Sequence, residues 1–275
     1  MLTLAQQTYV PDDDFEQHLI NEGYDNVLDD FVQTSAIDTV SALYLGFFIS
    51  NISDLTGIED FALLKTLTIS ANLNLTTLDV SNNIALTYLT CYNNQLTSLD
   101  VTQNTLLQHL EVPYNQLNSL DVSQNTALEK IECQENNINN LDLSNNISLI
   151  QLDCENNGLL SLDLRNGNNY YITRINIETN FNLTCVNVDD SVYSINNWDG
   201  NGTNINGQSI SAEFDPQHYY SNNCKGSTSI QEESFDKQHF IKVIDVLGKE
   251  VKGTKNELLF YIYHDGRVEK RIVIE

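Results

Sequence analysis

Leucines and other aliphatic residues recur through the middle of the chain with a period of 21 residues. The clearest series is a leucine followed by aspartate and a second aliphatic residue, at Leu78, Leu99, Leu120, Leu141 and Leu162. A fixed period of this length indicates coils stacked side by side, because one coil cannot bury its own apolar edge. The pattern therefore predicts a solenoid over residues 39–188.

Within each unit the apolar positions alternate as they do in a β-strand. Leu89 and Cys91 are two residues apart and are predicted to face inward, so the residues between and around them face outward. The Leu-Asp-Val half of the unit predicts a second short extended segment on the opposite wall. The expected fold class is mostly β, a solenoid of stacked parallel strands.

An asparagine follows each predicted strand, at Asn94, Asn115, Asn136 and Asn157. Buried polar groups need hydrogen-bond partners, and an amide side chain both donates and accepts. We therefore expect an asparagine ladder in which each side chain bonds to backbone groups of its own and neighbouring coils. An alanine in this position should destabilise the coil locally.

The terminal coils of a solenoid expose apolar faces unless a cap covers them. Residues 6–38 predict a short helical N-terminal cap. Asp13 or Asp14 is expected to cap a first helix that ends at Gly23. The apolar residues expected to form a second short helix are Val27, Leu28, Phe31 and Val32.

These motifs resemble the leucine-rich repeats of bacterial proteins. The 21-residue unit, with its LxCxxN and LDV halves, resembles the nested subclass called IRREKO, and the longer units upstream resemble internalin repeats. The segment from Asn182 to Cys224 looks like the cap that ends many exported repeat proteins. That resemblance implies a cap and linker over 189–230 and a Cys185–Cys224 disulfide, with two unpaired thiols as the alternative.

The pattern of apolar residues changes again in the last part of the chain. Alternating apolar residues from Phe240 and from Leu258, a turn at Asp265-Gly266 and a final run from Val268 predict a small antiparallel β module at 231–275. Its VIDVLGKEV, LFYIYHDG and EKRIVIE stretches resemble the C-terminal sorting domain of type IX secretion cargo. The alternative is an ordinary β hairpin. Residues 1–5 resemble the tail of a signal peptide.

The sorting-domain resemblance implies a protein that the type IX translocon delivers to the outside of a Gram-negative outer membrane.

The net charge of −25 restricts the classes of partner that the chain can bind. Residues 1–224 contain 29 acidic and 4 basic side chains, which excludes nucleic acid as a partner because phosphate binding needs basic residues. The apolar runs are too short for a transmembrane segment, which needs roughly 20 residues.

We find no motif for catalysis. The five histidines are scattered, and neither a serine-hydrolase, a zinc-protease nor a nucleotide-binding motif occurs. Cys91, Cys133 and Cys154 occupy the inward position and are expected to pack as small apolar residues. The chain is therefore predicted not to be an enzyme and to need no cofactor.

A column of aspartates is the one candidate for an ion. One residue per unit falls in this column, at Asp79, Asp100, Asp121, Asp142 and Asp163. Neighbouring carboxylates would stack at about 4.8 Å, and their repulsion in water costs on the order of 1 kcal/mol per pair. Calcium binding is one interpretation. A solvated surface or a backbone-capping role is the other.

The outward residues of the sheet are the candidate binding surface, since neighbouring coils align them into one extended face. We call these residues the sheet face: Tyr88, Thr90, Tyr92, His109, Glu111, Tyr114, Lys130, Glu132, Gln134, Gln151, Asp153, Glu155, Arg174, Asn176 and Glu178. The expected function is binding of a protein or glycan ligand at the cell surface. The alternatives are ordinary exposed strand residues on a structural surface-layer protein, or a carbohydrate-active enzyme.

Overall fold

The structure is a computed structural model that describes residues 6–46, 51–198, 202–224, 240–244, 258–263 and 268–272. The chain forms two compact units, Met1–Lys225 and Gly226–Glu275. The possible signal-peptide remnant at residues 1–5 lies outside the described residues. No helix among the described residues is long and apolar enough to span a bilayer.

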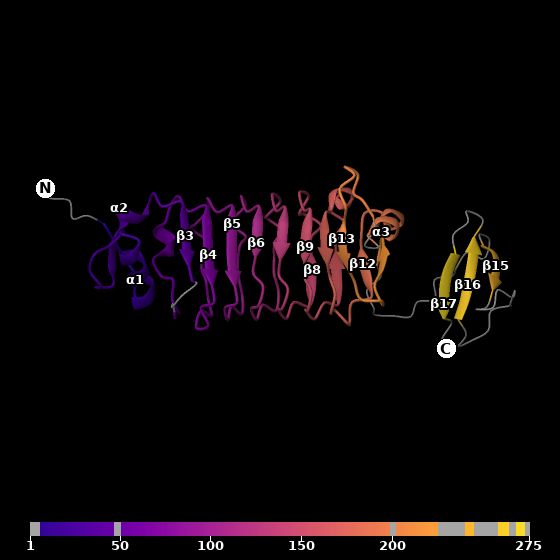
Figure 1. Ribbon diagram of the computed structural model, residues 1–275, viewed down its shortest axis with the longest axis horizontal. Helices are drawn as coiled ribbons and strands as arrows, with labels where there is room; N and C mark the ends of the chain where they lie inside the picture. The colour runs from indigo at the N-terminus through magenta and orange to yellow at the C-terminus, as the bar shows by residue number, and fades with distance from the viewer. Residues whose placement is uncertain are drawn as a thin grey trace. The chain divides into compact units, whose positions relative to one another are not determined.

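The first unit is built on a parallel sheet whose strands lie side by side along the stack of coils (Figure 1). The eight strands are, in order, β3 (Ala42–Leu45), β4 (Thr66–Ser70), β5 (Tyr88–Tyr92), β6 (His109–Glu111), β7 (Lys130–Glu132), β9 (Gln151–Asp153), β11 (Arg174–Asn176) and β13 (Ser211–Glu213). The register pairs Leu89 with Leu110 and Leu110 with Ile131, and all three are fully buried. The predicted inward strand positions are therefore confirmed.

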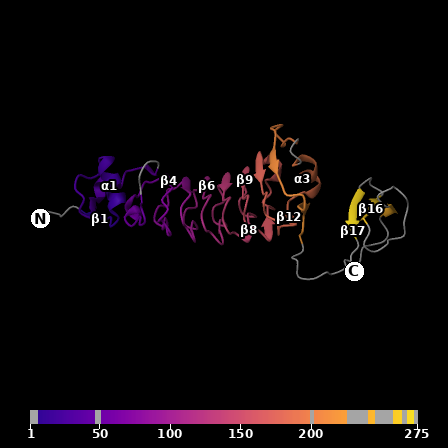
Figure 2. The same cartoon turned by 60° about the horizontal axis from the view of Figure 1, so that its bottom comes forward.

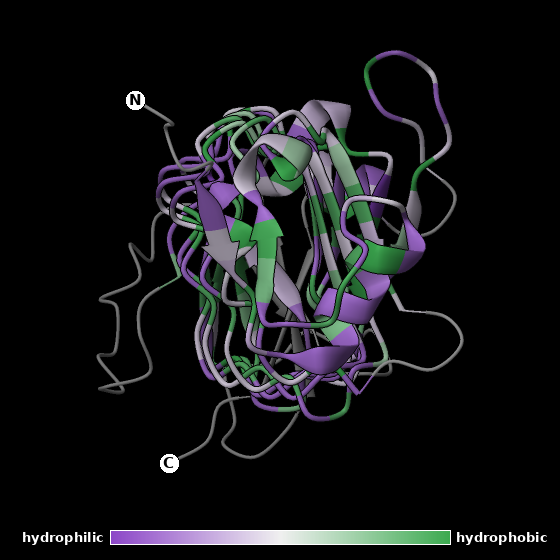
Figure 3. Cartoon of the chain, turned by 90° about the vertical axis from the view of Figure 1, so that its left-hand side faces the viewer, coloured by the Kyte–Doolittle hydropathy of each residue, from purple (hydrophilic) through white to green (hydrophobic). Residues whose placement is uncertain are grey.

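A second parallel sheet forms the opposite wall. Its strands are β8 (Asn140–Asp142), β10 (Ser161–Asp163), β12 (Cys185–Asn187) and β14 (Tyr219–Ser221). In earlier coils of the described chain the Leu-Asp-Val half forms only a parallel bridge between Asp79 and Asp100. Viewed along the stack, hydrophobic and hydrophilic segments alternate on both walls (Figure 3). This alternation places the aliphatic residues in one core that runs through the coils.

The predicted asparagine ladder is present. Asn136 Nδ2 donates to the carbonyl oxygens of Val112 (2.9 Å) and Cys133 (3.1 Å), and Asn136 Oδ1 accepts from the Leu117 amide (2.9 Å). Asn115, Asn157 and Asn180 repeat this pattern in their own coils. Each side chain thus joins two coils through backbone groups that would otherwise be buried without partners.

A second column of buried asparagines was not predicted. It consists of Asn83, Asn104, Asn125 and Asn146, all fully buried. Asn125 Nδ2, for example, donates to Val101 O (2.9 Å) and Asn104 O (2.8 Å) of the preceding coil. The signal was visible as a repeated asparagine in the LDVSxN half. That signal alone does not predict a core position, because asparagine is usually an exposed residue.

The N-terminal cap contains helix α1 (Asp13–Asn21), but its capping residue is Asp12. Asp12 Oδ1 accepts hydrogen bonds from the amides of Asp14 (3.1 Å) and Phe15 (3.0 Å), so the prediction of Asp13 or Asp14 was wrong by one or two positions. Gly23 follows the helix with a φ of 83°, the left-handed conformation that often ends helices.

The predicted second helix of the cap is wrong. Val27 and Leu28 lie in an exposed loop, and Phe31–Gln33 forms strand β2, which pairs antiparallel with β1 (Gln7–Tyr9). The fully buried Glu16 carboxylate accepts hydrogen bonds from the amides of Asp29, Asp30 and Phe31. Asp30 has a φ of 67°, which a right-handed helix cannot contain, and Phe31 pairs with Tyr9 in the sheet, so only the short helix α2 (Thr34–Ile37) follows.

The solenoid continues past the predicted end at residue 188. Helix α3 (Ser191–Asn197) interrupts the coil, after which β13 extends the main sheet and β14 extends the opposite wall. Figure 2 shows α3 at the end of the stack opposite α1. The predicted cap over 189–230 therefore includes a further coil. The inserted helix hides this coil in the sequence because it breaks the 21-residue period.

Two short 3₁₀ helices, η1 (Ile58–Asp60) and η2 (Asn169–Tyr171), complete the first unit. The described residues of the second unit form three antiparallel strands in the order β15 (Phe240–Ile244), β16 (Leu258–Tyr263) and β17 (Val268–Ile272). This agrees with the predicted antiparallel β module. The turn expected at Asp265-Gly266 lies outside the described residues.

Candidate ligand-binding surface

The sheet face lies on five neighbouring parallel strands, β5, β6, β7, β9 and β11, and on the corners that follow them. Most of its side chains are half-buried or exposed. Asp153 and Asn176 are corrections to the expectation of an exposed row, because each is only 3% accessible. They point outward from the sheet but lie beneath their neighbours, so neither is available for direct contact with a ligand.

Two pairs of aromatic rings lie at the N-terminal end of the sheet face, one at each end of β5. The Tyr88 ring stacks on His109 with centroids 5.3 Å apart, and Tyr92 meets Tyr114 edge to face at the same distance. Tyr92 is 43% and Tyr114 45% exposed. Tyr114 reaches this position from the left-handed corner after β6, where its φ is 56°. We call these four residues the aromatic patch.

Glu111 connects the aromatic patch to the charged part of the sheet face. It accepts hydrogen bonds from Tyr88 Oη (3.1 Å) and Thr90 Oγ1 (3.3 Å), and Lys130 Nζ lies 2.7 Å from Glu111 Oε1 and 2.8 Å from Glu132 Oε1. Burial alone would lower the pKa of Lys130, but the hydrogen bonds that its ammonium donates to the two carboxylates leave this pKa raised. Lys130 therefore remains charged and is already paired.

The C-terminal part of the sheet face is held together around Asp153. Arg174 Nη2 lies 2.7 Å from Asp153 Oδ2, and Asn176 Nδ2 donates to the same oxygen (3.4 Å) and to Glu155 Oε2 (3.0 Å). These contacts cover Asp153 and orient Glu155. The exposed Glu213 on β13 adds a further carboxylate that the sequence did not predict, since β13 lay beyond the expected end of the solenoid.

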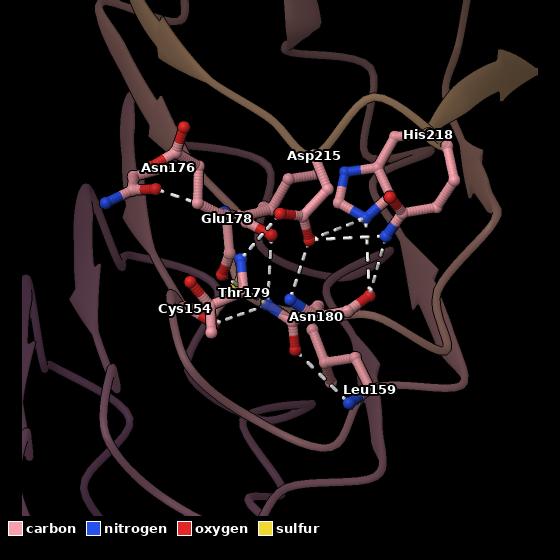
Figure 4. Close-up of polar contacts among 10 residues, drawn as sticks. Cys154, Leu159, Asn176, Glu178, Thr179, Asn180, Asp215 and His218 are labelled. Carbon is pink, nitrogen blue, oxygen red and sulfur yellow. Dashed lines mark hydrogen bonds and ion pairs between the residues drawn. The ribbon is translucent and has the colours of Figure 1, made fainter.

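Asp215 fastens the last coil to the one before it (Figure 4). Its carboxylate accepts hydrogen bonds from the amides of Thr179 (3.0 Å) and Asn180 (2.8 Å), and His218 Nε2 lies 3.6 Å from it. No motif in the sequence indicated this cluster. Thr179 and Asp215 are 36 residues apart and meet only because β13 adds to the sheet.

The buried His218 predicts a loss of stability at mildly acidic pH. Burial lowers its pKa, although the Asn180 carbonyl and the Asp215 carboxylate oppose this. The unfolded chain then binds more protons than the folded one below the ordinary histidine pKa of about 6.5, so stability falls as the pH falls. Urea midpoints measured at about pH 7.5 and about pH 5.5 test this.

The variant His218→Gln should show a smaller decrease between the two pH values than the native chain. A part of the decrease should remain, since burial also lowers the pKa of His18. A native chain that is more stable at the lower pH would contradict the prediction. That result would mean that the ion pair with Asp215 outweighs the cost of burying the charged imidazole.

The carboxylates of the aspartate column bind backbone amides. Each carboxylate accepts a hydrogen bond from the amide two residues later, at Ser81, Thr102, Ser123, Ser144 and Arg165. Hydrogen bonds from Ser81 hold the pKa of Asp79 below its usual value, and those from Thr102 do the same for Asp100. The geometry fits the backbone-capping interpretation. Calcium binding by this column stays a prediction.

Among the described residues, acidic side chains close enough to share a metal ion occur in the N-terminal cap. The sets are Asp13, Glu16 and Asp30, and Glu16, Asp25 and Asp29. The Glu16 carboxylate is already used by three backbone amides. Its observed role is therefore to hold the loop between α1 and β2.

Cys91, Cys133 and Cys154 are fully buried free thiols. Burial raises the pKa of Cys133 to about 12 and raises the pKa of the other two as well. A thiol that stays protonated and enclosed is a poor nucleophile and a poor metal ligand. These residues therefore act in packing. Cys185 and Cys224 are joined by a disulfide, with Cα atoms 5.8 Å apart.

Among known proteins, the chain is similar only to solved structures. No family model and no curated protein matches the chain. The functional domain of InlJ from Listeria monocytogenes, whose structure includes a cysteine ladder, is 27% identical with a TM-score of 0.41, over 68% of this chain and 53% of that domain. The matched part thus spans about half of the InlJ domain.

Two further bacterial structures are similar. The internalin InlF from Listeria monocytogenes is 18% identical with a TM-score of 0.36, over 66% of this chain and 72% of that one. A leucine-rich repeat protein from Leptospira interrogans is 22% identical with a TM-score of 0.39, over 54% and 45% of the two chains. The fold of the first unit, a leucine-rich repeat solenoid of parallel strands, is evident from its own coils.

Proposed function

We propose that this chain is a recognition protein of the bacterial cell surface whose sheet face binds a protein ligand with a basic segment. The observation that carries the proposal is the exposed Tyr92–Tyr114 pair beside a group of carboxylates on a rigid parallel sheet. Exposed tyrosines give large contact area at low cost in conformational entropy, and they are common among the residues that dominate binding energy.

The charges of the sheet face support the choice of a basic partner. Lys130 and Arg174 are both paired within the face, so neither is free to attract an acidic ligand. Glu155 and Glu178 remain partly exposed toward the C-terminal end. Complementary charge accelerates association and excludes acidic competitors.

Export through the type IX pathway is part of the same proposal. Its support is the acidic first unit joined to a separate antiparallel β unit with balanced charge, whose sequence resembles type IX sorting domains. The Cys185–Cys224 disulfide fits an oxidising compartment, where such bonds persist. The translocon would then be the first partner of the chain, and the ligand of the sheet face the second.

A protein and glycan array probed with the full chain tests the proposed function. We expect basic proteins among the ligands, and we expect the combined variant Tyr88→Ala, Tyr92→Ala, Tyr114→Ala to lose at least about 100-fold in affinity. The matched control is Tyr219→Ala, which removes an exposed tyrosine from β14 on the opposite wall.

Circular dichroism should show that the triple variant keeps its fold, since the three side chains lie outside the core. Unchanged affinity of the triple variant would reject the sheet face as the binding surface. Ordered self-assembly without any ligand would favour a surface-layer role instead. Hydrolysis of a polysaccharide would favour the alternative of a carbohydrate-active enzyme.

A further inference from the structure

A groove with a volume of about 670 Å³ lies at one edge of the coil stack, where the chain enters β9 and β11. Its walls come from three separate segments. Ile147 and Gln151 belong to one coil, Asn168 and Tyr171 to the next, and Asn206 and Gln208 to the loop before β13. The volume falls within the range of about 300–1,000 Å³ that is usual for sites of small ligands.

The groove lining is uncharged within the part of the chain that the structure describes. Its polar groups are amides and hydroxyls, and it includes no carboxylate, ammonium or guanidinium. A cation would be expected to select carboxylates and an anion to select basic groups. The lining therefore fits a neutral ligand.

The lining combines flat apolar surface with available amides. Tyr171 is 42% and Ile147 60% exposed, so a ring and an aliphatic side chain border the groove. The side-chain amides of Gln151 and Asn206 make no hydrogen bond within the described residues. An amide donates and accepts at once, as neighbouring sugar hydroxyls do. A sugar ring also has an apolar face that can pack on a tyrosine ring.

The loop side of the groove is held in place before any ligand binds. Buried Asn204 accepts hydrogen bonds at Oδ1 from the amides of Asn206 (3.0 Å) and Gln208 (3.0 Å), and its Nδ2 donates to Gln208 Oε1 (2.9 Å). The Ile205 amide donates to Tyr170 O (2.9 Å), which ties the loop to the neighbouring coil. This preorganisation lowers the entropic cost of binding.

We propose that this groove binds a short neutral oligosaccharide, in a site separate from the aromatic patch. Tyr171 provides the surface on which a sugar ring packs. Gln151 of β9 and Asn206 of the loop before β13 bind its hydroxyl groups. The site does not depend on the proposed protein ligand, and it gives the chain a second specificity, for uncharged glycan.

The test uses trisaccharides as probes on the full chain. Cellotriose, xylotriose, mannotriose, laminaritriose and triacetylchitotriose are examined by saturation-transfer NMR, and any binder is titrated by calorimetry. We expect at least one neutral probe to bind at millimolar concentration or below. Tyr171→Ala and Asn206→Ala should each weaken that binding about tenfold or more, whereas Tyr171→Phe should retain it because the ring remains.

The controls separate this site from the aromatic patch. Tyr219→Ala and Asn137→Ala remove an exposed tyrosine and an exposed asparagine elsewhere and should leave the affinity unchanged. The triple variant of Tyr88, Tyr92 and Tyr114 should also bind the trisaccharide normally, even if it loses a protein ligand. The proposal is overturned if no neutral probe binds, if only a charged oligosaccharide or a peptide binds, or if Tyr171→Ala and Asn206→Ala bind as the native chain does.

Discussion

Replacing Asn136 by alanine should lower the free energy of unfolding of the solenoid by about 2–4 kcal/mol. The change leaves the buried Leu117 amide without its acceptor, and this alone costs about 1–3 kcal/mol. It also removes one of the two asparagine donors at Val112 O and one of the two at Cys133 O, which are shared with Asn115 and Asn157 respectively. The small cavity left in the ladder adds to the loss.

The neighbouring Asn137→Ala is the matched control. Asn137 is exposed, so its replacement should change the free energy of unfolding by no more than about 0.5 kcal/mol. Urea titrations of both variants followed by circular dichroism measure the difference. Equal midpoints for the two variants would show that the ladder contributes little to stability and that the aliphatic core alone holds the coils together.

Loss of the Cys185–Cys224 disulfide should cost about 3–4 kcal/mol. The two cysteines are 39 residues apart in the sequence, and opening a loop of this size increases the entropy of the unfolded chain by a corresponding amount. The effect should appear first in β13 and β14, because these strands form the outer edge of the two sheets and have a neighbouring strand on one side only. The double variant Cys185→Ser, Cys224→Ser tests this.

Hydrogen exchange should show that Ser211–Glu213 and Tyr219–Ser221 lose protection in the double variant while the strands β5 to β9 keep theirs. Reducing agent should destabilise the native chain to a similar extent and should have no effect on the variant, whose three remaining cysteines are already free thiols. A native chain with the same urea midpoint before and after reduction would contradict the prediction.

The coils themselves could be predicted because each repeats the same local pattern. The period of 21 residues and the two-residue alternation at Leu89 and Cys91 are sufficient to identify a stack of parallel strands. The ladder at Asn136 follows from the need to pair buried backbone groups. The prediction of a second helix in the cap failed for a physical reason of another kind, since the left-handed φ of Asp30 and the pairing of β2 with β1 are not encoded in the local apolar pattern.

The candidate site, too, was predictable only in part. Its outward positions follow from strand periodicity, and the structure places Tyr88 beside His109 on neighbouring strands. Alternation tells which side of a sheet a residue faces but not what covers it there. Asp153 faces outward and is nevertheless buried, because Arg174 and Asn176 from the next strand bond over it.

The sequence by itself determined the repeating coil, its inward aliphatic residues, its asparagine ladder and the strongly acidic character of the body. The first three depend on contacts between equivalent positions one period apart, so a single period specifies them, and the charge follows from composition alone. Only the tertiary structure decided that a coil continues beyond α3, that Asp215 fastens it to Thr179, and that three segments line an uncharged groove beside Tyr171. Those features join residues at unrelated positions, and their contacts exist only once the chain has folded.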